Sequence, residues 1–224
     1  MQTLATDLWA DQQPLRFVGM EIGTRMTVIR LPTGGLWIHS PIEATDERLE
    51  AVRALGEPAA LIAPTRFHHM FIGGWRDAFP DASLHLAPGL ASKRPDLMPA
   101  EVLGDEAPAA WAGHIEQVVV KGFPLANEVV FYHPPTATLV ATDLAFNPSP
   151  SFSVGTRFAL RLAGVKGLLS PTLLERFGIR DRTAFRSSFD RILEWPFERV
   201  IVAHGDIVEV GGREALLEGY AFLR

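Results

Sequence analysis

Short apolar runs separated by glycine, proline and polar residues fill the first forty positions. Residues 16–21 and 25–30 have the composition of strands, with Gly23 at the turn between them. A further turn at residues 32–35 precedes a third strand-like run at 36–40. Because glycine and proline punctuate strands at turns, this pattern predicts an antiparallel meander in the N-terminal part of the chain.

The hydrophobic period then changes from strand to helix. Residues 45–55 form an amphipathic pattern with Thr45 at the N-cap position and acidic residues in the first turn, which predicts a helix. Apolar strands are expected at residues 59–63 and 83–87, and the aromatic residues between them, at 70–79, have near-helical spacing. The segment therefore predicts a strand–loop–helix–strand unit.

The second half of the chain repeats this mixture without a solenoid repeat, a low-complexity tract or a linker. Its order of elements predicts an α/β fold in one domain, residues 1–224, with two mixed sheets between helical layers. The expected strands are 115–120, 128–132, 138–142 and 199–203, and the expected helices are 156–163, 181–193 and 213–223, with a shorter helical segment that begins at Pro171.

Composition narrows the classes of function. The chain has 224 residues, 47% of them hydrophobic, which is enough for a substantial core. Its net charge of -5 argues against binding to nucleic acid or to an anionic membrane, since both favour basic surfaces. The N-terminal residues lack a basic region, and no apolar run reaches membrane-spanning length. We therefore expect a cytoplasmic protein that acts, if at all, on a small molecule.

The chain has no cysteine, so disulfides, thiol nucleophiles and thiolate metal sites are excluded. Any metal must be held by histidine, aspartate or glutamate. Three apolar runs end on such residues: the first leads to His68 and His69, the second to Asp143, and the third to His204. Ligand sites in α/β folds commonly lie at the carboxyl ends of strands, so these four side chains are the candidate metal ligands.

Each candidate also has a purely structural interpretation. In this interpretation, one of His68 and His69 caps a helix and the other packs at a strand–helix junction. In the metal-binding interpretation, these adjacent residues can share one metal only where the backbone turns between them. Asp143 would cap a turn after its strand. His204 would bond to the backbone in a tight turn, where Gly205 permits close approach of another segment.

Three further residues could line such a site. His39 is either a hydrogen-bond partner of a ligand histidine or a buried residue at the end of a strand. Asp206 either orients His204 or caps its turn. Arg66 supplies positive charge in place of a metal, binds an anionic group of a substrate, or lies at the surface. No glycine-rich phosphate loop and no serine nucleophile elbow accompanies them.

These segments, taken in order, resemble the motifs of the metallo-β-lactamase superfamily. The similarity extends to one of its branches, the domain of unknown function DUF4336, in the Phe67-His68-His69 segment and the residues that follow it. The resemblance implies an αββα fold and a hydrolytic site with one or two metals. The segments that carry it are residues 36–40, 64–69, 129–134, 142–144 and 203–206, together with Trp75 and 88–90.

The superfamily's His-x-His-x-Asp-His motif can be placed on this chain position by position. Its first two histidines fall on Pro64 and Arg66, and the third histidine of the first metal site falls near Phe123. Its aspartate falls on His68 and its last histidine on His69. The aspartate of the early strand falls on His39. The resemblance thus implies that the first metal site has been lost.

The second metal site is implied to persist, with Asp143 at the position of the bridging aspartate and His204 at that of the final histidine. Its four ligands would be His68, His69, Asp143 and His204. Three nitrogens and one oxygen suit Zn²⁺ first, with Fe²⁺ or Mn²⁺ as alternatives, rather than Ca²⁺ or Mg²⁺.

We therefore expect one divalent transition metal and hydrolysis of a small ester, amide or phosphoester by activated water. Four protein ligands, however, are typical of a closed structural site. Two alternatives stay open for this reason. One is a catalytically degenerate binding or scaffold module, and the other is a mononuclear iron redox protein. Neither the substrate nor the oligomeric state is indicated by the sequence.

Overall fold

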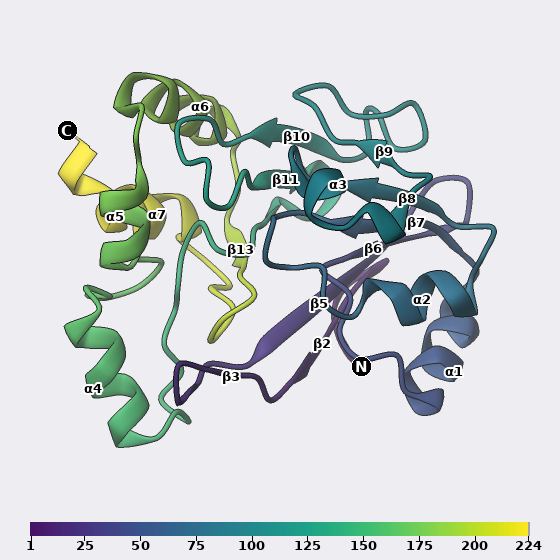
Figure 1. Ribbon diagram of the computed structural model, residues 1–224, viewed down its shortest axis with the longest axis horizontal. Coiled ribbons are helices and arrows are strands. Elements are labelled where there is room, and N and C mark those ends of the chain that lie inside the picture. The colour runs from purple at the N-terminus through teal and green to yellow at the C-terminus, as the bar shows by residue number, and fades with distance from the viewer. Residues whose placement is uncertain (224) are drawn as a thin grey trace.

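Two β-sheets pack face to face, and helices cover the outer face of each (Figure 1). The computed structural model describes residues 1–223. The larger sheet has the strand order β1-β2-β5-β6-β7-β8-β9 and the smaller one the order β10-β11-β12-β13. A separate hairpin, β3–β4, lies beside them.

The larger sheet comprises β1 (Gln2–Ala5), β2 (Leu8–Gln13), β5 (Thr24–Arg30), β6 (Leu36–His39), β7 (Pro58–Ala63), β8 (Ser83–Leu86) and β9 (Glu101–Val102). The smaller sheet comprises β10 (Glu116–Val119), β11 (Val129–His133), β12 (Thr138–Val140) and β13 (Arg199–Ile201), and the hairpin comprises β3 (Arg16–Phe17) and β4 (Met20–Glu21). The α-helices are α1 (Asp46–Leu55), α2 (Ile72–Ala78), α3 (Leu90–Lys93), α4 (Val154–Leu162), α5 (Leu173–Gly178), α6 (Arg182–Glu194) and α7 (Gly212–Gly219). Short 3-10 turns are η1 (Pro95–Leu97), η2 (Pro134–Thr136) and η3 (Ala221–Leu223).

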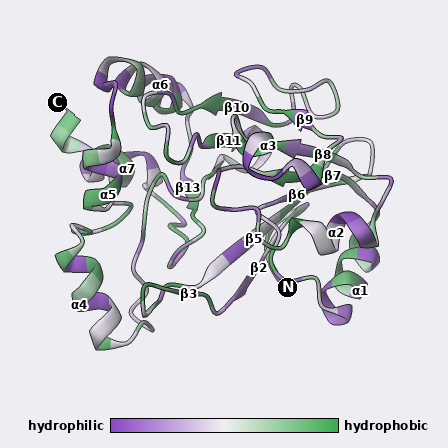
Figure 2. Cartoon of the chain, viewed as in Figure 1, coloured by the Kyte–Doolittle hydropathy of each residue, from purple (hydrophilic) through white to green (hydrophobic). Residues whose placement is uncertain are grey.

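The four layers follow from the alternation of side chains along each strand. In β6, Leu36 and Ile38 pack with α1 and α2, whereas Trp37 faces the smaller sheet. In β11, Phe131 faces the larger sheet, while Tyr132 packs against α6 and α7. Successive residues of a strand point to opposite faces, and both faces are covered here. This is why strands such as β7 and β11 are largely apolar. Figure 2 colours each residue of the chain by its hydropathy.

Most helices begin where a side chain caps them. Oγ1 of Thr45 accepts a hydrogen bond from the Arg48 amide at 3.4 Å, which confirms the predicted start of α1. Oδ1 of Asp181 accepts from the Ala184 amide at 2.9 Å at the start of α6. None of the helices within residues 1–223 combines the length and the apolar content that crossing a bilayer requires.

The sequence pattern was wrong in part about the N-terminal strands. The single strand expected at residues 16–21 is the hairpin β3–β4, because Val18 and Gly19 adopt positive φ angles of 47° and 79° and reverse the chain. The β1–β2 hairpin was not expected at all. β1 is at the edge of the sheet and is largely exposed, so its polar residues hide the strand pattern.

Several imidazoles are buried in the inter-sheet core, and His39 is the one whose protonation should weaken the fold most in acid. Burial, together with the nearby His68, lowers the pKa of His39 to about 3. The unfolded chain, with an ordinary pKa of about 6.5, binds the proton first as the pH falls. The contribution of neutral His39 to the free energy of unfolding is therefore complete above about pH 6.5. It decreases as the pH falls towards 3.

We expect His39 to account for about 2 kcal/mol of the unfolding free energy lost between about pH 7 and 5. Urea denaturation with a chelator present, at both pH values, measures this loss. A His39→Gln variant should lose correspondingly less over the same interval. An equal loss in both proteins would show that His39 is not the linked group.

Candidate metal centre

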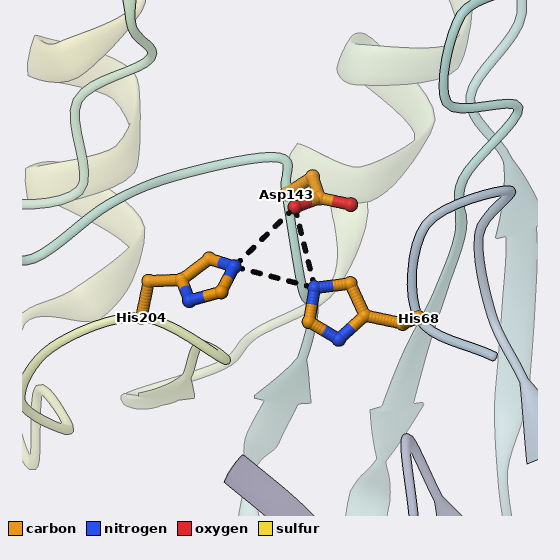
Figure 3. A group of neighbouring side chains, drawn as sticks. All are labelled: His68, Asp143 and His204. Atoms are coloured by element: carbon orange, nitrogen blue, oxygen red, sulfur yellow. Dashed lines mark hydrogen bonds and ion pairs between the residues drawn. The ribbon is translucent and has the colours of Figure 1, made fainter. Parts of the chain in front are cut away.

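Three side chains from three separate segments converge on one point beyond the ends of the strands (Figure 3). Nε2 of His68 lies 3.3 Å from Oδ1 of Asp143 and 3.3 Å from Nε2 of His204. Nε2 of His204 lies 3.6 Å from the same carboxylate oxygen. His68 follows β7, Asp143 follows β12 and His204 follows β13, so each side chain is supplied from beyond the carboxyl end of its strand.

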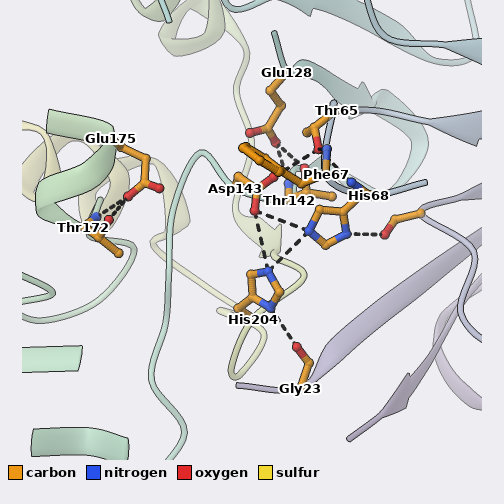
Figure 4. Close-up of polar contacts among 11 residues, drawn as sticks. Gly23, Thr65, Phe67, His68, Glu128, Thr142, Asp143, Thr172, Glu175 and His204 are labelled. Carbon is orange, nitrogen blue, oxygen red and sulfur yellow. Dashed lines mark hydrogen bonds and ion pairs between the residues drawn. The ribbon is translucent and has the colours of Figure 1, made fainter. Parts of the chain in front are cut away.

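The turn after β7 is shaped by one threonine. Oγ1 of Thr65 accepts hydrogen bonds from the amides of Phe67 and His68, both at 3.0 Å, and donates to Oδ2 of Asp143 at 3.1 Å (Figure 4). Thr65 is fully buried. A single hydroxyl therefore fixes both the loop that carries His68 and the orientation of the carboxylate.

The second nitrogen of each histidine ring is held by a different element. Nδ1 of His204 donates to the carbonyl of Gly23 at 2.7 Å. A carbonyl can only accept, so Nδ1 carries a proton and Nε2 is the ring nitrogen that faces the other two side chains. The ring of Phe146 stacks on that of His204 with centroids 5.0 Å apart. Nδ1 of His68 lies 2.8 Å from Oγ of Ser40. Such outer contacts fix the direction of ligating imidazoles.

Asp143 is held as an anion by the two imidazoles. Burial opposes its charge, but the neighbouring His68 and His204 outweigh burial and hold the pKa of Asp143 below its ordinary value. Behind it, Oε1 of Glu128 accepts from the amide and hydroxyl of Thr142 at 2.5 and 2.9 Å. Burial, reinforced by the charge of Asp143, raises the pKa of Glu128 and favours its protonated form. Negative charge is therefore concentrated on Asp143.

A buried arginine connects the larger sheet to the loop that carries His204. Nη1 of Arg25 donates to the carbonyl of Val202, and Nη2 donates to the carbonyl of Gly205 at 2.7 Å and to Oε1 of Gln12 at 3.1 Å. Burial lowers the pKa of Arg25, and the charge of Asp206 opposes that effect. The cation thus anchors the backbone on both sides of His204.

His69 is not brought into the cluster. Nη1 of Arg94 lies 2.9 Å from Nδ1 of His69, on the opposite side of the turn from His68. Burial, followed by the charges of Lys93 and Arg94, lowers the pKa of His69 to about 4. The backbone after Thr65 turns towards α2, and adjacent side chains diverge there. Of the four expected ligands, the structure therefore gathers three.

Within residues 1–223, none of the three residues expected around the site forms a hydrogen bond to the cluster. His39 is buried against Trp37, with ring centroids 5.4 Å apart, and its Nε2 has no hydrogen-bond partner within residues 1–223. Nη1 of Arg66 donates to the carbonyl of Pro124 at 3.1 Å. Asp206 is exposed at the wall of a cleft of about 550 Å³, and its backbone pairs with Asn147.

The contacts to the cluster instead come from Gly23, Ser40 and Thr65, for which the sequence predicted no role at the site. Gly23 contributes only its carbonyl, so its side chain gives no signal of this role. Thr65 lies between Pro64 and Arg66, the positions at which the resemblance implied a lost metal site. A hydroxyl so close to the candidate ligands was the one signal in the sequence that could have been used.

The turn after His204 leaves no room for a side chain at Gly205. Its φ is +99°, and a Cβ placed there would lie 1.7 Å from the carbonyl oxygen of Asn147. We expect Gly205→Ala to destabilise the protein by more than the roughly 1–2 kcal/mol of a left-handed residue alone, because backbone must also move.

Gly211 is the matched control, with φ of +70° and no heavy atom within 4 Å of the position that a Cβ would take. Thermal unfolding of Gly205→Ala and Gly211→Ala compares the two substitutions. Equal decreases in Tm would contradict the close approach of Asn147 to this turn.

Comparison with known proteins identifies the fold. A metallo-β-lactamase from Pontibacter korlensis superposes with a TM-score of 0.67 at 15% identity, covering 99% of this chain and 97% of that one. The metallo-β-lactamase FIM-1 from Pseudomonas aeruginosa, in its mono-zinc form, gives 0.60 at 12% identity, with 99% and 94% covered. The Flv1 flavodiiron core from Synechocystis sp. PCC6803 gives 0.65 at 12% identity, with 98% and 59% covered.

These solved structures share their fold with this chain. Because their sequence identity is low, the comparison supports no more specific conclusion. No curated protein matches the sequence. The model of the family described as "Domain of unknown function (DUF4336)" matches residues 5–151, which is more than half of the chain. The protein therefore belongs to the DUF4336 family and has the metallo-β-lactamase fold.

Proposed function

We propose that this protein binds one divalent transition metal through His68, Asp143 and His204 and hydrolyses a small ester, amide or phosphoester. The observation that carries the proposal is the spacing of the three atoms, 3.3, 3.3 and 3.6 Å. Ligands of a tetrahedral zinc at its usual bond lengths lie roughly 3.3 to 3.6 Å from one another. The cluster therefore has the dimensions of three corners of a metal coordination sphere.

The donor set fits the same group. The carbonyl of Gly23 holds the His204 ring with Nε2 directed inwards, and the two imidazoles lower the pKa of Asp143. Two nitrogens and one carboxylate oxygen suit zinc, iron or manganese, whereas calcium and magnesium prefer oxygen alone. The spacing and the chemical types of the three donor atoms therefore support the binding of a transition metal.

Four protein ligands would leave no coordination position for water or substrate. His69 contacts Arg94 instead of the cluster, so this objection to catalysis does not apply. Three protein ligands leave a fourth position for water or substrate, as in catalytic zinc centres. When bound, the metal supplies Lewis acidity and lowers the pKa of a coordinated water. The chain itself holds the geometry: Thr65 orients Asp143, Ser40 orients His68, and Phe146 covers the ring of His204.

The similarity to metallo-β-lactamases supports hydrolysis as the class of reaction. The mono-zinc form of FIM-1 from Pseudomonas aeruginosa further supports one metal within this fold. The side chains of the three ligands keep between 5% and 11% of their surface exposed, so the cluster is nearly buried and a substrate would reach it only if neighbouring side chains moved aside.

A second candidate is an iron-dependent redox protein. Two histidines and one carboxylate are also the ligands of mononuclear iron oxygenases, and a flavodiiron core is among the structural neighbours. The two functions require different metals in the same three-ligand site, so the identity of the bound metal separates them.

We expect about one equivalent of zinc in protein purified without added metal or chelator. Elemental analysis by mass spectrometry measures the metal in the wild type and in two variants. His204→Ala should lose the metal because it removes one of three ligands. His69→Ala should retain it, since His69 contacts Arg94 rather than the cluster.

Near-stoichiometric iron in place of zinc would favour the redox candidate. If the wild type holds no metal after reconstitution with zinc, iron and manganese in turn, the metal site is refuted. The fold would then be a binding or scaffold module. Loss of metal in His69→Ala, with the fold intact, would show that the fourth ligand belongs to the site.

Ser40→Ala should lower metal affinity by about tenfold, because His68 loses the partner that orients its ring. Competition with a chromogenic chelator measures the change. Ser83→Ala is the matched control, since Oγ of Ser83 lies 2.8 Å from Nε2 of His85, a second serine–histidine pair outside the cluster. The proposed orienting role fails if both variants bind metal as the wild type does.

A further inference from the structure

Helix α4 carries an apolar stripe that faces solvent. Val154, Phe158 and Leu162 are 75%, 63% and 67% exposed, and their spacing of four residues places them on one face of the helix. Thr156 and Leu160 are buried on the other side. A helix at the surface of a globular protein normally presents polar residues outwards. Within residues 1–223, the exposed stripe therefore does not belong to a hydrophobic core.

The stripe extends onto neighbouring segments. Leu168 is 56% exposed, Phe177 of α5 is 83% exposed, and Val18 in the turn of the β3–β4 hairpin is 80% exposed. The amide of Leu173 donates to the carbonyl of Ala163 at 2.6 Å and joins the start of α5 to the end of α4. The β4 strand contacts α4 directly. Figure 1 shows α4, α5 and the hairpin along the same side of the molecule.

Exposed cations accompany these apolar side chains. Arg157 and Arg161 lie next to Phe158 and Leu162 in sequence and share a neighbouring face of α4, and Lys166 follows the helix. Within residues 1–223, none of these three side chains forms an ion pair or a hydrogen bond. Large exposed apolar groups flanked by free cations are typical of surfaces that meet an anionic amphiphile.

The charge of this segment is opposite to that of the whole chain. Residues 153–182 contain six lysines and arginines and two acids, a net charge of +4, whereas the chain carries -5. One of the two acids, Glu175, is buried and bonded to Thr172. The average over the whole sequence, on which the expectation of no membrane partner was based, conceals a basic region.

We propose that the surface formed by α4, Leu168 and Phe177 binds an anionic lipid bilayer. The apolar stripe would enter the boundary between headgroups and acyl chains, and Arg157 and Arg161 would reach the lipid phosphates along their aliphatic stems. A second copy of the chain fits less well, because an isologous dimer through this face would bring two regions of net +4 together. The proposal does not depend on the metal site.

Cosedimentation with vesicles tests the proposal on the full chain. We expect binding to phosphatidylcholine vesicles that contain about a third phosphatidylglycerol, little binding to phosphatidylcholine alone, and release when salt rises from about 0.1 to 0.5 M. The double variant Arg157→Glu, Arg161→Glu should lower the partition coefficient by about tenfold or more, because each cation near an anionic surface contributes about fivefold.

Phe158→Asp with Leu162→Asp tests the apolar contribution and should abolish binding even at low salt. Val102→Asp is the matched control: Val102 is 58% exposed on β9, which Figure 1 places at the opposite end of the molecule from α4. All these side chains are exposed, so Tm should change little, and unfolding curves verify this.

Three results would overturn the proposal. The first is no binding to the anionic vesicles, and the second is equal loss of binding in the Val102→Asp control. The third is a dimer, detected by light scattering, that Phe158→Asp with Leu162→Asp converts to monomer while vesicles capture neither form. That result would assign the surface to self-association.

Discussion

The candidate site depends on a buried cation, Arg25, that links the two sheets. Its guanidinium donates to backbone carbonyls on both sides of His204, and the same segment of chain supplies the Gly23 carbonyl that orients the His204 ring. A buried charge is tolerated only where hydrogen bonds replace water. The register between the start of β5 and the loop after β13 is therefore fixed, and with it the direction of His204.

The arrangement of the other two side chains follows from a single turn. The hydroxyl of Thr65 closes the loop after β7 and holds the carboxylate of Asp143, so His68 and Asp143 are positioned together. The same turn sends His69 towards Arg94. The change from four expected ligands to three alters the chemistry that can be proposed, because a three-ligand centre has a position for water or substrate.

In this molecule several titratable side chains are buried, while large apolar side chains are exposed on one surface. Several imidazoles and the carboxyl groups of Glu128 and Asp143 are buried, and backbone or hydroxyl groups bond to many of them. Apolar side chains are instead exposed on α4 and α5 beside Arg157 and Arg161, which form no ion pair within residues 1–223. Averages of charge and hydrophobicity over the whole chain hide these two regions. The regions become visible only when the residues are placed in the structure.

The sequence by itself determined the layers of the fold and the identity of the candidate ligands. Continuous apolar runs require sheets covered on both faces, Thr45 marks the start of α1, and His68, Asp143 and His204 follow strands that the hydrophobic pattern locates. The tertiary structure alone decided that His68 rather than His69 joins the cluster, and that Gly23, Ser40 and Arg25 support it. The reason is physical: the direction of a side chain in a turn depends on backbone dihedral angles, and a backbone carbonyl leaves no trace in the residue type that bears it.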